Sequence, residues 1–127
     1  MEERKNTFPK REHLCGDAVI STLYHEGKSF LSYPVKVTYL LVDDSEPVRC
    51  LVWAPKRKFK HSVDRNRVRR QLREAYRKNK YPLIDAANAL GKSLHFSMIY
   101  IDDKLLPSYI IEKKLKVVID KLIKQMK

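Results

Sequence analysis

The sequence predicts an α+β fold in which helices pack against a small, mostly antiparallel sheet of about four strands. Two neighbouring segments, 35–42 and 48–54, alternate between apolar and other residues, as half-buried strands do. Five residues, 43–47, separate them, and such a short polar connection is typical of an antiparallel pair. Two long segments, 65–80 and 108–126, carry apolar residues at the helical period instead. With 127 residues, the chain is long enough for a single domain with one modest core.

The remaining elements complete this arrangement. We expect residues 1–9, which are polar and charged, to be flexible. A short helix should then end at Gly27, followed by a short strand near 28–30. Segment 94–101 is apolar on both faces, which predicts a central strand covered on both sides.

The segment 65–80 predicts a helix with one buried face. It contains no Pro or Gly, and its apolar residues recur one helical turn apart. These are Val68, Leu72, Ala75 and Tyr76. We expect Ser62 or Asp64 to cap its first turn. Tyr81-Pro82 should end it, and a short helical segment over 83–90 should follow.

Positive charge is concentrated in one part of the chain, residues 56–80. This segment holds twelve Lys and Arg against two acidic residues, and so carries ten of the chain's net charge of +12. Between 65 and 77 the basic residues are all arginines, whose forked guanidinium groups match phosphate geometry. A local field of this kind indicates a polyanionic partner such as RNA.

The spacing of residues within 56–74 resembles the signature of the bacterial ribonuclease P protein component. That signature has a basic pair, a small residue followed by Val, an Arg-Asn-Arg box, a second basic pair and an Arg-Glu step. The matching residues are Lys56-Arg57, Ser62-Val63, Arg65-Asn66-Arg67, Arg69-Arg70 and Arg73-Glu74. Upstream, Ile20, Leu23, Tyr24 and Gly27 stand where the family has a branched and aromatic helix ending in Gly.

The resemblance implies a role in tRNA maturation. In this family a large RNA subunit holds the active site and the Mg²⁺ ions, and the holoenzyme removes the 5′ leader of precursor tRNA. The protein binds the RNA subunit, and here the resemblance assigns that role to Lys56, Arg57, Lys60, Arg65, Asn66, Arg67, Arg69, Arg70 and Arg73. It assigns the leader contact to Tyr24 and Ile20, although Ile20 cannot stack on a base as an aromatic residue would. We expect Phe30 and Tyr33 on the same leader-binding surface, with packing in the core as the alternative for both.

The resemblance also implies a fold like the second domain of ribosomal protein S5, with a rare left-handed crossover around the basic helix. The residue pattern itself contains no information on that handedness. The sequence shows no secretory signal and no apolar run near 18 residues, so we expect a cytoplasmic protein.

We expect no catalytic residue, metal site or small-molecule cofactor in the chain itself. The four His are scattered, and the two Cys, Cys15 and Cys50, do not form a metal motif. Asp43-Asp44 and Asp102-Asp103 lie in predicted turns, although paired carboxylates can hold Mg²⁺ in nucleases. The main alternative is a non-catalytic protein that binds ribosomal RNA. A helix-turn-helix DNA-binding protein is disfavoured, because a strand and a basic loop precede the basic helix.

Overall fold

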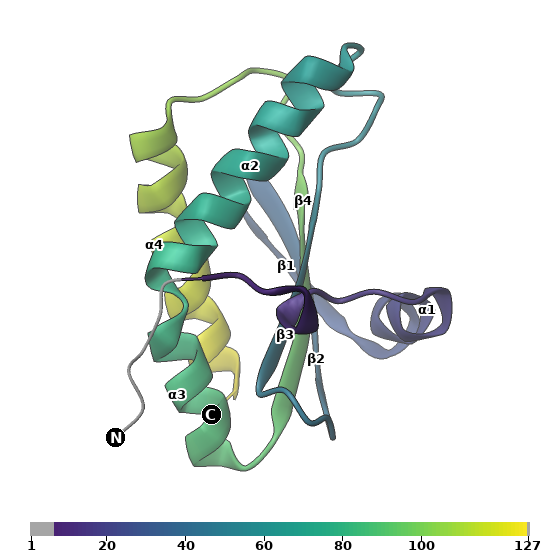
Figure 1. Ribbon diagram of the computed structural model, residues 1–127, viewed down its shortest axis with the longest axis vertical. Coiled ribbons are helices and arrows are strands. Elements are labelled where there is room, and N and C mark those ends of the chain that lie inside the picture. Colours follow the sequence, from purple (N-terminus) through teal and green to yellow (C-terminus); the bar gives the residue numbers. More distant parts are fainter. Residues whose placement is uncertain (1–6, 127) are drawn as a thin grey trace.

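The computed structural model describes residues 7–126 and contains one four-stranded sheet (Figure 1). In spatial order its strands are β1 (Lys28–Ser32), β2 (Val35–Val42), β4 (Ser93–Tyr100) and β3 (Val48–Trp53). β1–β2 and β2–β4 are antiparallel, and only β3–β4 is parallel. The predicted α+β class, the number of strands and the mostly antiparallel pairing are confirmed.

The helices are divided unequally between the two faces of this sheet. Three of them, α2 (Ser62–Asn79), α3 (Tyr81–Leu90) and α4 (Ser108–Met126), lie on one side (Figure 1). The short helix α1 (Asp17–Glu26) lies on the other side, and much of that face is left uncovered. The connection from β3 through α2 and α3 to β4 crosses the helix side in the left-handed sense, as the family resemblance implied.

Apolar side chains from both layers meet between the sheet and the three helices. On β4, alternate residues such as Phe96 and Met98 point to this side and are fully buried. The four apolar residues predicted to form one stripe of α2 are all buried against them, and α4 contributes a similar stripe. Because this stripe fixes the rotation of α2 about its axis, the exposed arginines of α2 face away from the core.

The first turn of α2 differs from the prediction. The helix begins at Ser62, and neither Ser62 nor Asp64 caps it through its side chain. The backbone carbonyl of His61 instead accepts the amides of Asp64 and Arg65, at 3.1 and 3.3 Å. The turn is therefore closed by the backbone, and Ser62 is already helical.

The N-terminal segment is attached along the edge strand β3. Residues 1–6 of the segment expected to be flexible lie outside the described part of the chain, but Phe8 packs against Tyr76 with ring centroids 5.2 Å apart. Lys80, which is almost fully buried, forms an ion pair with Glu12 of the 3-10 turn η1 (Lys10–Glu12) at 2.7 Å. The amide of Leu14 then donates to the carbonyl of Cys50 in β3 at 3.0 Å. Phe8, which falls within the segment expected to be flexible, is thus in contact with the core.

A group of charged residues joins the β2–β3 turn to the sheet. Asp44 accepts from Arg49 Nε at 2.5 Å and lies 2.7 Å from His95 Nε2. The Arg49 guanidinium, together with His95 and the Ser45 amide, holds the pKa of Asp44 well below its ordinary value of 3.8 despite partial burial. A depressed carboxyl pKa means that the folded state favours the ionised form, so Asp44 stabilises the fold when it is charged.

We expect Asp44→Asn to lower the free energy of unfolding by about 2 kcal/mol at pH 7, because charge-assisted hydrogen bonds are lost. The difference between wild type and variant should shrink as the pH falls below about 4, where the unfolded carboxyl takes up a proton. Urea denaturation from pH 7 to pH 3 measures both effects. Asp43→Asn is the control, because its side chain is 89% exposed and its pairing with Lys92 is a surface contact. Equal losses in the two variants would contradict this role for Asp44.

Candidate nucleic-acid interface

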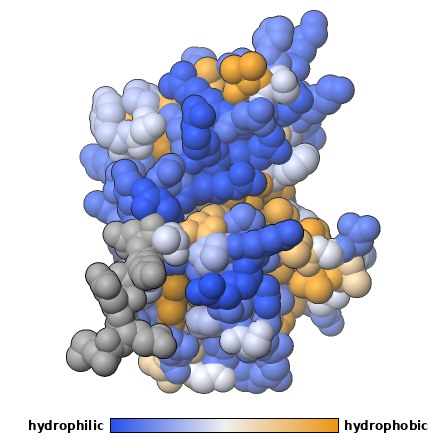
Figure 2. Space-filling view, viewed as in Figure 1, coloured by the Kyte–Doolittle hydropathy of each residue, from blue (hydrophilic) through white to orange (hydrophobic). Residues whose placement is uncertain are grey.

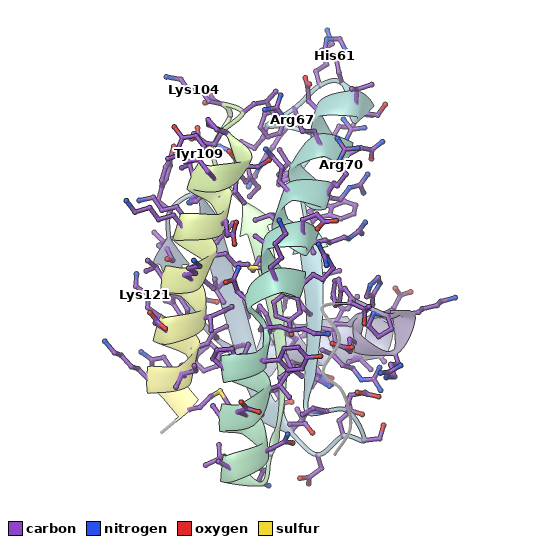
Figure 3. All side chains as sticks on the ribbon, turned by 60° about the vertical axis from the view of Figure 1, so that its left-hand side comes forward. His61, Arg67, Arg70, Lys104, Tyr109 and Lys121 are labelled. Atoms are coloured by element: carbon purple, nitrogen blue, oxygen red, sulfur yellow. The ribbon has the colours of Figure 1, made fainter. Side chains whose placement is uncertain are left out.

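The solvent-facing side of α2 carries arginines that are not neutralised within the protein. Arg67, Arg70 and Arg73 are exposed, and none forms an ion pair with a carboxylate in residues 7–126. Figure 3 shows Arg67 and Arg70 on the N-terminal half of the helix, and Figure 2 shows hydrophilic residues covering this region. Their charges are therefore available to an external anion.

Two other predicted RNA-binding arginines of α2 make contacts within the protein. Arg65 is half-buried and donates from Nη1 to the carbonyls of Phe59 and Lys60, at 2.7 and 3.1 Å. Arg69 donates to the side-chain carbonyl of Asn66. Its guanidinium also lies over the Trp53 ring, with the carbon 5.7 Å from the ring centroid. These contacts keep the positive charge of both side chains and fix their position.

The basic loop between β3 and α2 is held in place by an apolar anchor. Phe59 is 5% exposed and packs near Tyr100, with 5.6 Å between the ring centroids. Together with the two hydrogen bonds from Arg65, this anchor fixes the loop backbone. Lys56, Arg57 and Lys60 are all exposed. The loop cations thus lie beside those of α2 and belong to one surface.

A groove of about 490 Å³ lies between α2 and the N-terminal segment. It is lined by Phe8, His13, Asn66, Arg69, Arg70, Arg73, Glu74 and Arg77. Glu74 is the one acidic residue in this lining, and it pairs with Arg77 at 2.6 Å. The groove is large enough for part of a polynucleotide, and its charge suits phosphate. The groove therefore brings together four of the nine predicted RNA-binding residues, Asn66, Arg69, Arg70 and Arg73.

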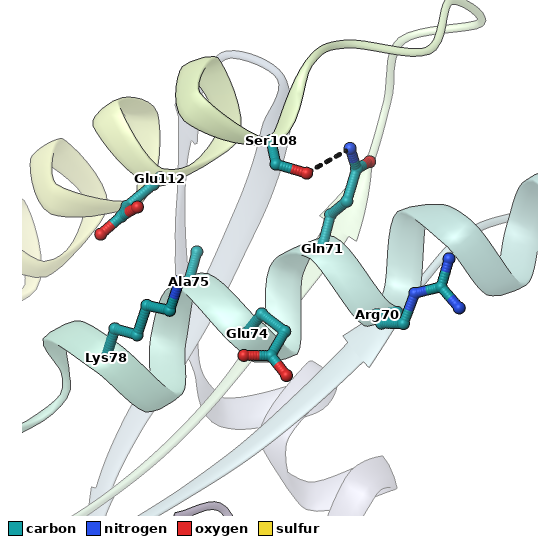
Figure 4. A pocket seen from close by; sticks show the side chains of 7 residues that line it. All are labelled: Arg70, Gln71, Glu74, Ala75, Lys78, Ser108 and Glu112. Atoms are coloured by element: carbon teal, nitrogen blue, oxygen red, sulfur yellow. Dashed lines mark hydrogen bonds between the residues drawn. The ribbon is translucent and has the colours of Figure 1, made fainter. Parts of the chain in front are cut away.

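A second pocket lies between α2 and α4, and its character is different (Figure 4). Its volume is about 120 Å³, well below that of ordinary small-molecule sites. Its lining contains two basic residues, Arg70 and Lys78, and two acidic residues, Glu74 and Glu112, so that the lining has little net charge. Gln71 bridges the helices by donating to Ser108 Oγ at 3.1 Å. This pocket connects two helices and has neither the charge nor the room of the groove.

The residues predicted to contact a leader are divided by the sheet. Tyr24 and Ile20 lie on α1, and the Tyr24 hydroxyl donates to Ser97 on the uncovered face of β4 at 3.1 Å. Tyr33 lies in the β1–β2 turn, is 53% exposed, and donates to Asp102. Phe30 is on the opposite face, 6.0 Å from the Tyr39 ring.

The position of Phe30 follows from strand periodicity. It pairs with Val37, which faces the helices, and side chains at paired positions share a face. Lys121 of α4 further covers its ring at 5.9 Å. The structure thus brings Tyr24 and Ile20 together and separates Phe30 from them.

Trp53 was not among the predicted site residues. It is 49% exposed at the end of β3, next to the basic loop. The sequence places it opposite the buried residues of β3, which identifies a solvent-facing Trp in a strand. This exposed position is the sequence feature that could have identified Trp53 as a site residue, because an exposed Trp is unusual unless it has a partner.

The described residues contain no group of three or more His, Cys, Asp or Glu that could hold a metal ion. Burial raises the pKa of the Cys50 thiol far above its ordinary value, so Cys50 stays protonated and is a poor nucleophile. Within the same part of the chain, no helix is both long enough and apolar enough to span a membrane.

The chain has clear relatives of known identity. The family model Ribonuclease P matches residues 8–103. The ribonuclease P protein component of Porphyromonas gingivalis is 36% identical over 98 residues, which cover 76% of this chain and 72% of the relative. The same component from Chlorobaculum tepidum is 34% identical over 104 residues, covering 77% and 68%.

Solved structures show the same fold. The ribonuclease P protein of Staphylococcus aureus superposes with a TM-score of 0.69 over 87% of this chain and 94% of that protein, at 17% identity. The ribonuclease P protein of Thermotoga maritima gives a TM-score of 0.68 over 87% and 97%, at 18% identity. The match to the family model and the identity to curated members show that this chain belongs to the ribonuclease P protein family.

Proposed function

We propose that the chain binds the RNA subunit of ribonuclease P through the exposed side of α2, the groove beside it and the basic loop. As a member of the family, it is a component of the ribonuclease P endoribonuclease, which matures tRNA. The observation that carries the proposal is the unneutralised arginine surface of α2, formed by Arg67, Arg70 and Arg73. The proposed contact set also contains Lys56, Arg57, Lys60, Arg65, Asn66 and Arg69.

Electrostatics explains what such a surface would do. Packing two RNA molecules against each other is opposed by the repulsion between their phosphates, and bound cationic side chains reduce it. We place the chemistry and the Mg²⁺ ions in the RNA subunit. The chain supplies positive charge at fixed positions, because Arg65 and Phe59 hold the loop and the apolar stripe holds α2.

We propose that the uncovered face of the sheet contacts the single-stranded leader of precursor tRNA. Tyr24 supports this assignment because it is 43% exposed and its hydroxyl is fixed by Ser97. Ile20 and Tyr33 remain in the proposed contact set. Phe30 is left out of it, because it packs on the helix side. A cytoplasmic location, where both RNA partners occur in bacteria, completes the proposal.

Binding to ribosomal RNA without a catalytic partner is not favoured. It would account for the charge, but the identity to ribonuclease P proteins spans both the basic surface and the sheet. Recovery of ribosomal subunits in place of ribonuclease P RNA by the tagged chain would support this alternative.

Reconstitution tests the proposed function directly. We expect the purified chain, mixed with a bacterial ribonuclease P RNA at low Mg²⁺, to raise the rate of precursor-tRNA cleavage above that of the RNA alone. The reason is that added cationic charge replaces part of the screening that Mg²⁺ provides. Cleavage is measured by gel separation of leader and mature tRNA. Cleavage by the chain without RNA would instead identify a self-sufficient nuclease.

The salt dependence of RNA binding tests the arginine surface. If about six phosphates are neutralised, log affinity should fall with log salt at a slope of about −4 to −5. Arg70→Ala combined with Arg73→Ala should reduce the magnitude of this slope by about 2, since two phosphate contacts are lost. Titration of the RNA subunit at several salt concentrations gives both slopes.

A variant matched in charge controls for the change in net charge. Lys113 and Lys116 are exposed on α4, so Lys113→Ala with Lys116→Ala removes the same charge from another helix. This control should leave the slope near the wild-type value. Circular dichroism should show an unchanged fold for both pairs, because all four side chains are exposed. Equal slopes for the two double variants would contradict a localised binding surface.

A further inference from the structure

Trp53 ends a row of residues that crosses the uncovered face of the sheet. The strand register places Leu31 opposite Lys36, Lys36 opposite Ile99, and Ile99 opposite Trp53. Leu31 is 65% exposed and Trp53 is 49% exposed, while Lys36 is also open to solvent. With strands about 4.8 Å apart, the row spans about 14 Å. It offers three apolar side chains that are at least partly exposed, with the cation of Lys36 among them.

Tyr24 lies close to this row and on the same face. Its hydroxyl binds Ser97, which is two residues before Ile99 on β4, or about 7 Å along the strand. Helix α1 therefore covers the sheet beside the row and leaves the row itself open. A strand of RNA that contacts Tyr24 can continue onto Leu31, Ile99 and Trp53.

Trp53 also marks the boundary between this face and the arginine surface. β3 is one of the two edge strands, and Arg69 reaches around its edge from α2 to the Trp53 ring. Arg69 is itself fixed by Asn66 and lines the groove. One side of the indole is thus occupied by a held cation. The attraction between this cation and the aromatic ring helps to fix the position of the indole. The exposed half of the side chain stays available for stacking.

We propose that Trp53 is a specificity-determining residue that stacks on one unpaired base of the precursor-tRNA leader, with Arg69 acting as its positioning residue. Every base has a π face, so stacking on an aromatic side chain suits a leader of variable sequence. The indole presents more surface than the other aromatic side chains, which accounts for a half-exposed Trp in a strand. The inference rests on the function proposed above and adds a contact that the sequence comparison did not supply.

The leader is favoured over the RNA subunit as the source of the base. The ring belongs to the same sheet face as Tyr24, whereas the exposed arginines of α2 lie on the helix side. The base that stacks on Trp53 would therefore belong to the leader nucleotide that lies at the edge of the sheet.

The chain contains a single Trp, so its fluorescence reports this site alone. We expect little change in emission when the chain binds the RNA subunit or when mature tRNA is then added. Precursor tRNA with a leader should quench the emission, because a stacked base contacts the indole. Quenching that is complete with the RNA subunit alone, or absent with all three RNAs, would overturn the assignment.

Two substitutions separate stacking from apolar packing. Trp53→Leu keeps an apolar side chain without a π face, and Trp53→Phe keeps a smaller aromatic ring. In the reconstituted holoenzyme, Trp53→Leu should weaken binding of leader-containing precursor roughly fivefold to a hundredfold, and Trp53→Phe should weaken it less. Both should bind mature tRNA as the wild type does.

The outcomes distinguish this inference from the function on which it rests. If the wild type raises cleavage but Trp53→Leu binds the precursor as tightly as wild type, only the role of Trp53 is wrong. If both variants bind mature tRNA more weakly, Trp53 supports the fold or assembly and the leader assignment is again wrong. If the wild type fails to raise cleavage, the proposed function is overturned and this inference with it.

Discussion

The burial of one face of α2 against the sheet determines where this protein carries its charge. Val68, Leu72, Ala75 and Tyr76 can reach the core only in one rotation of the helix, and that rotation directs the arginines outward. Like charges one turn apart repel, so the isolated helix would gain nothing from its arginines. Tertiary packing therefore has to offset that repulsion. The stability of the apolar layer therefore allows positive charges to lie close together on one surface.

A second set of contacts holds the basic loop and several basic side chains in fixed positions. Arg65 holds the basic loop through two carbonyls, Phe59 anchors the same loop, and Lys80 is withdrawn from the surface to pair with Glu12. Fixing a long side chain before binding reduces the entropy lost when RNA arrives. The chain thus uses its basic residues in two ways, some to position the surface and others to meet phosphate.

Much of the fold could be predicted from the sequence, because its segments have strong periodicity. Alternation identified β2 and β3, and the helical stripe identified which side of α2 is buried. The left-handed crossover was predicted only from the family resemblance, because the order of residues contains no information on handedness.

The prediction that Ser62 or Asp64 caps α2 was wrong, because the backbone carbonyl of His61 closes that turn. Phe30 was expected on the surface that carries Tyr24, with core packing as the alternative, and strand parity puts it on the core side. Arg69 on Trp53 is a contact between separate elements, which sequence reasoning could not supply.

The hydrogen bond between Leu14 and Cys50 has a consequence for solubility. β3 is an edge strand, and an edge strand with free amides and carbonyls can pair with another molecule. The N-terminal segment occupies part of that edge and is locked there by Phe8 and Glu12. It therefore shields the sheet from strand addition as well as forming one wall of the groove. A chain trimmed beyond Leu14 would lose both at once, and self-association would accompany any loss of RNA affinity.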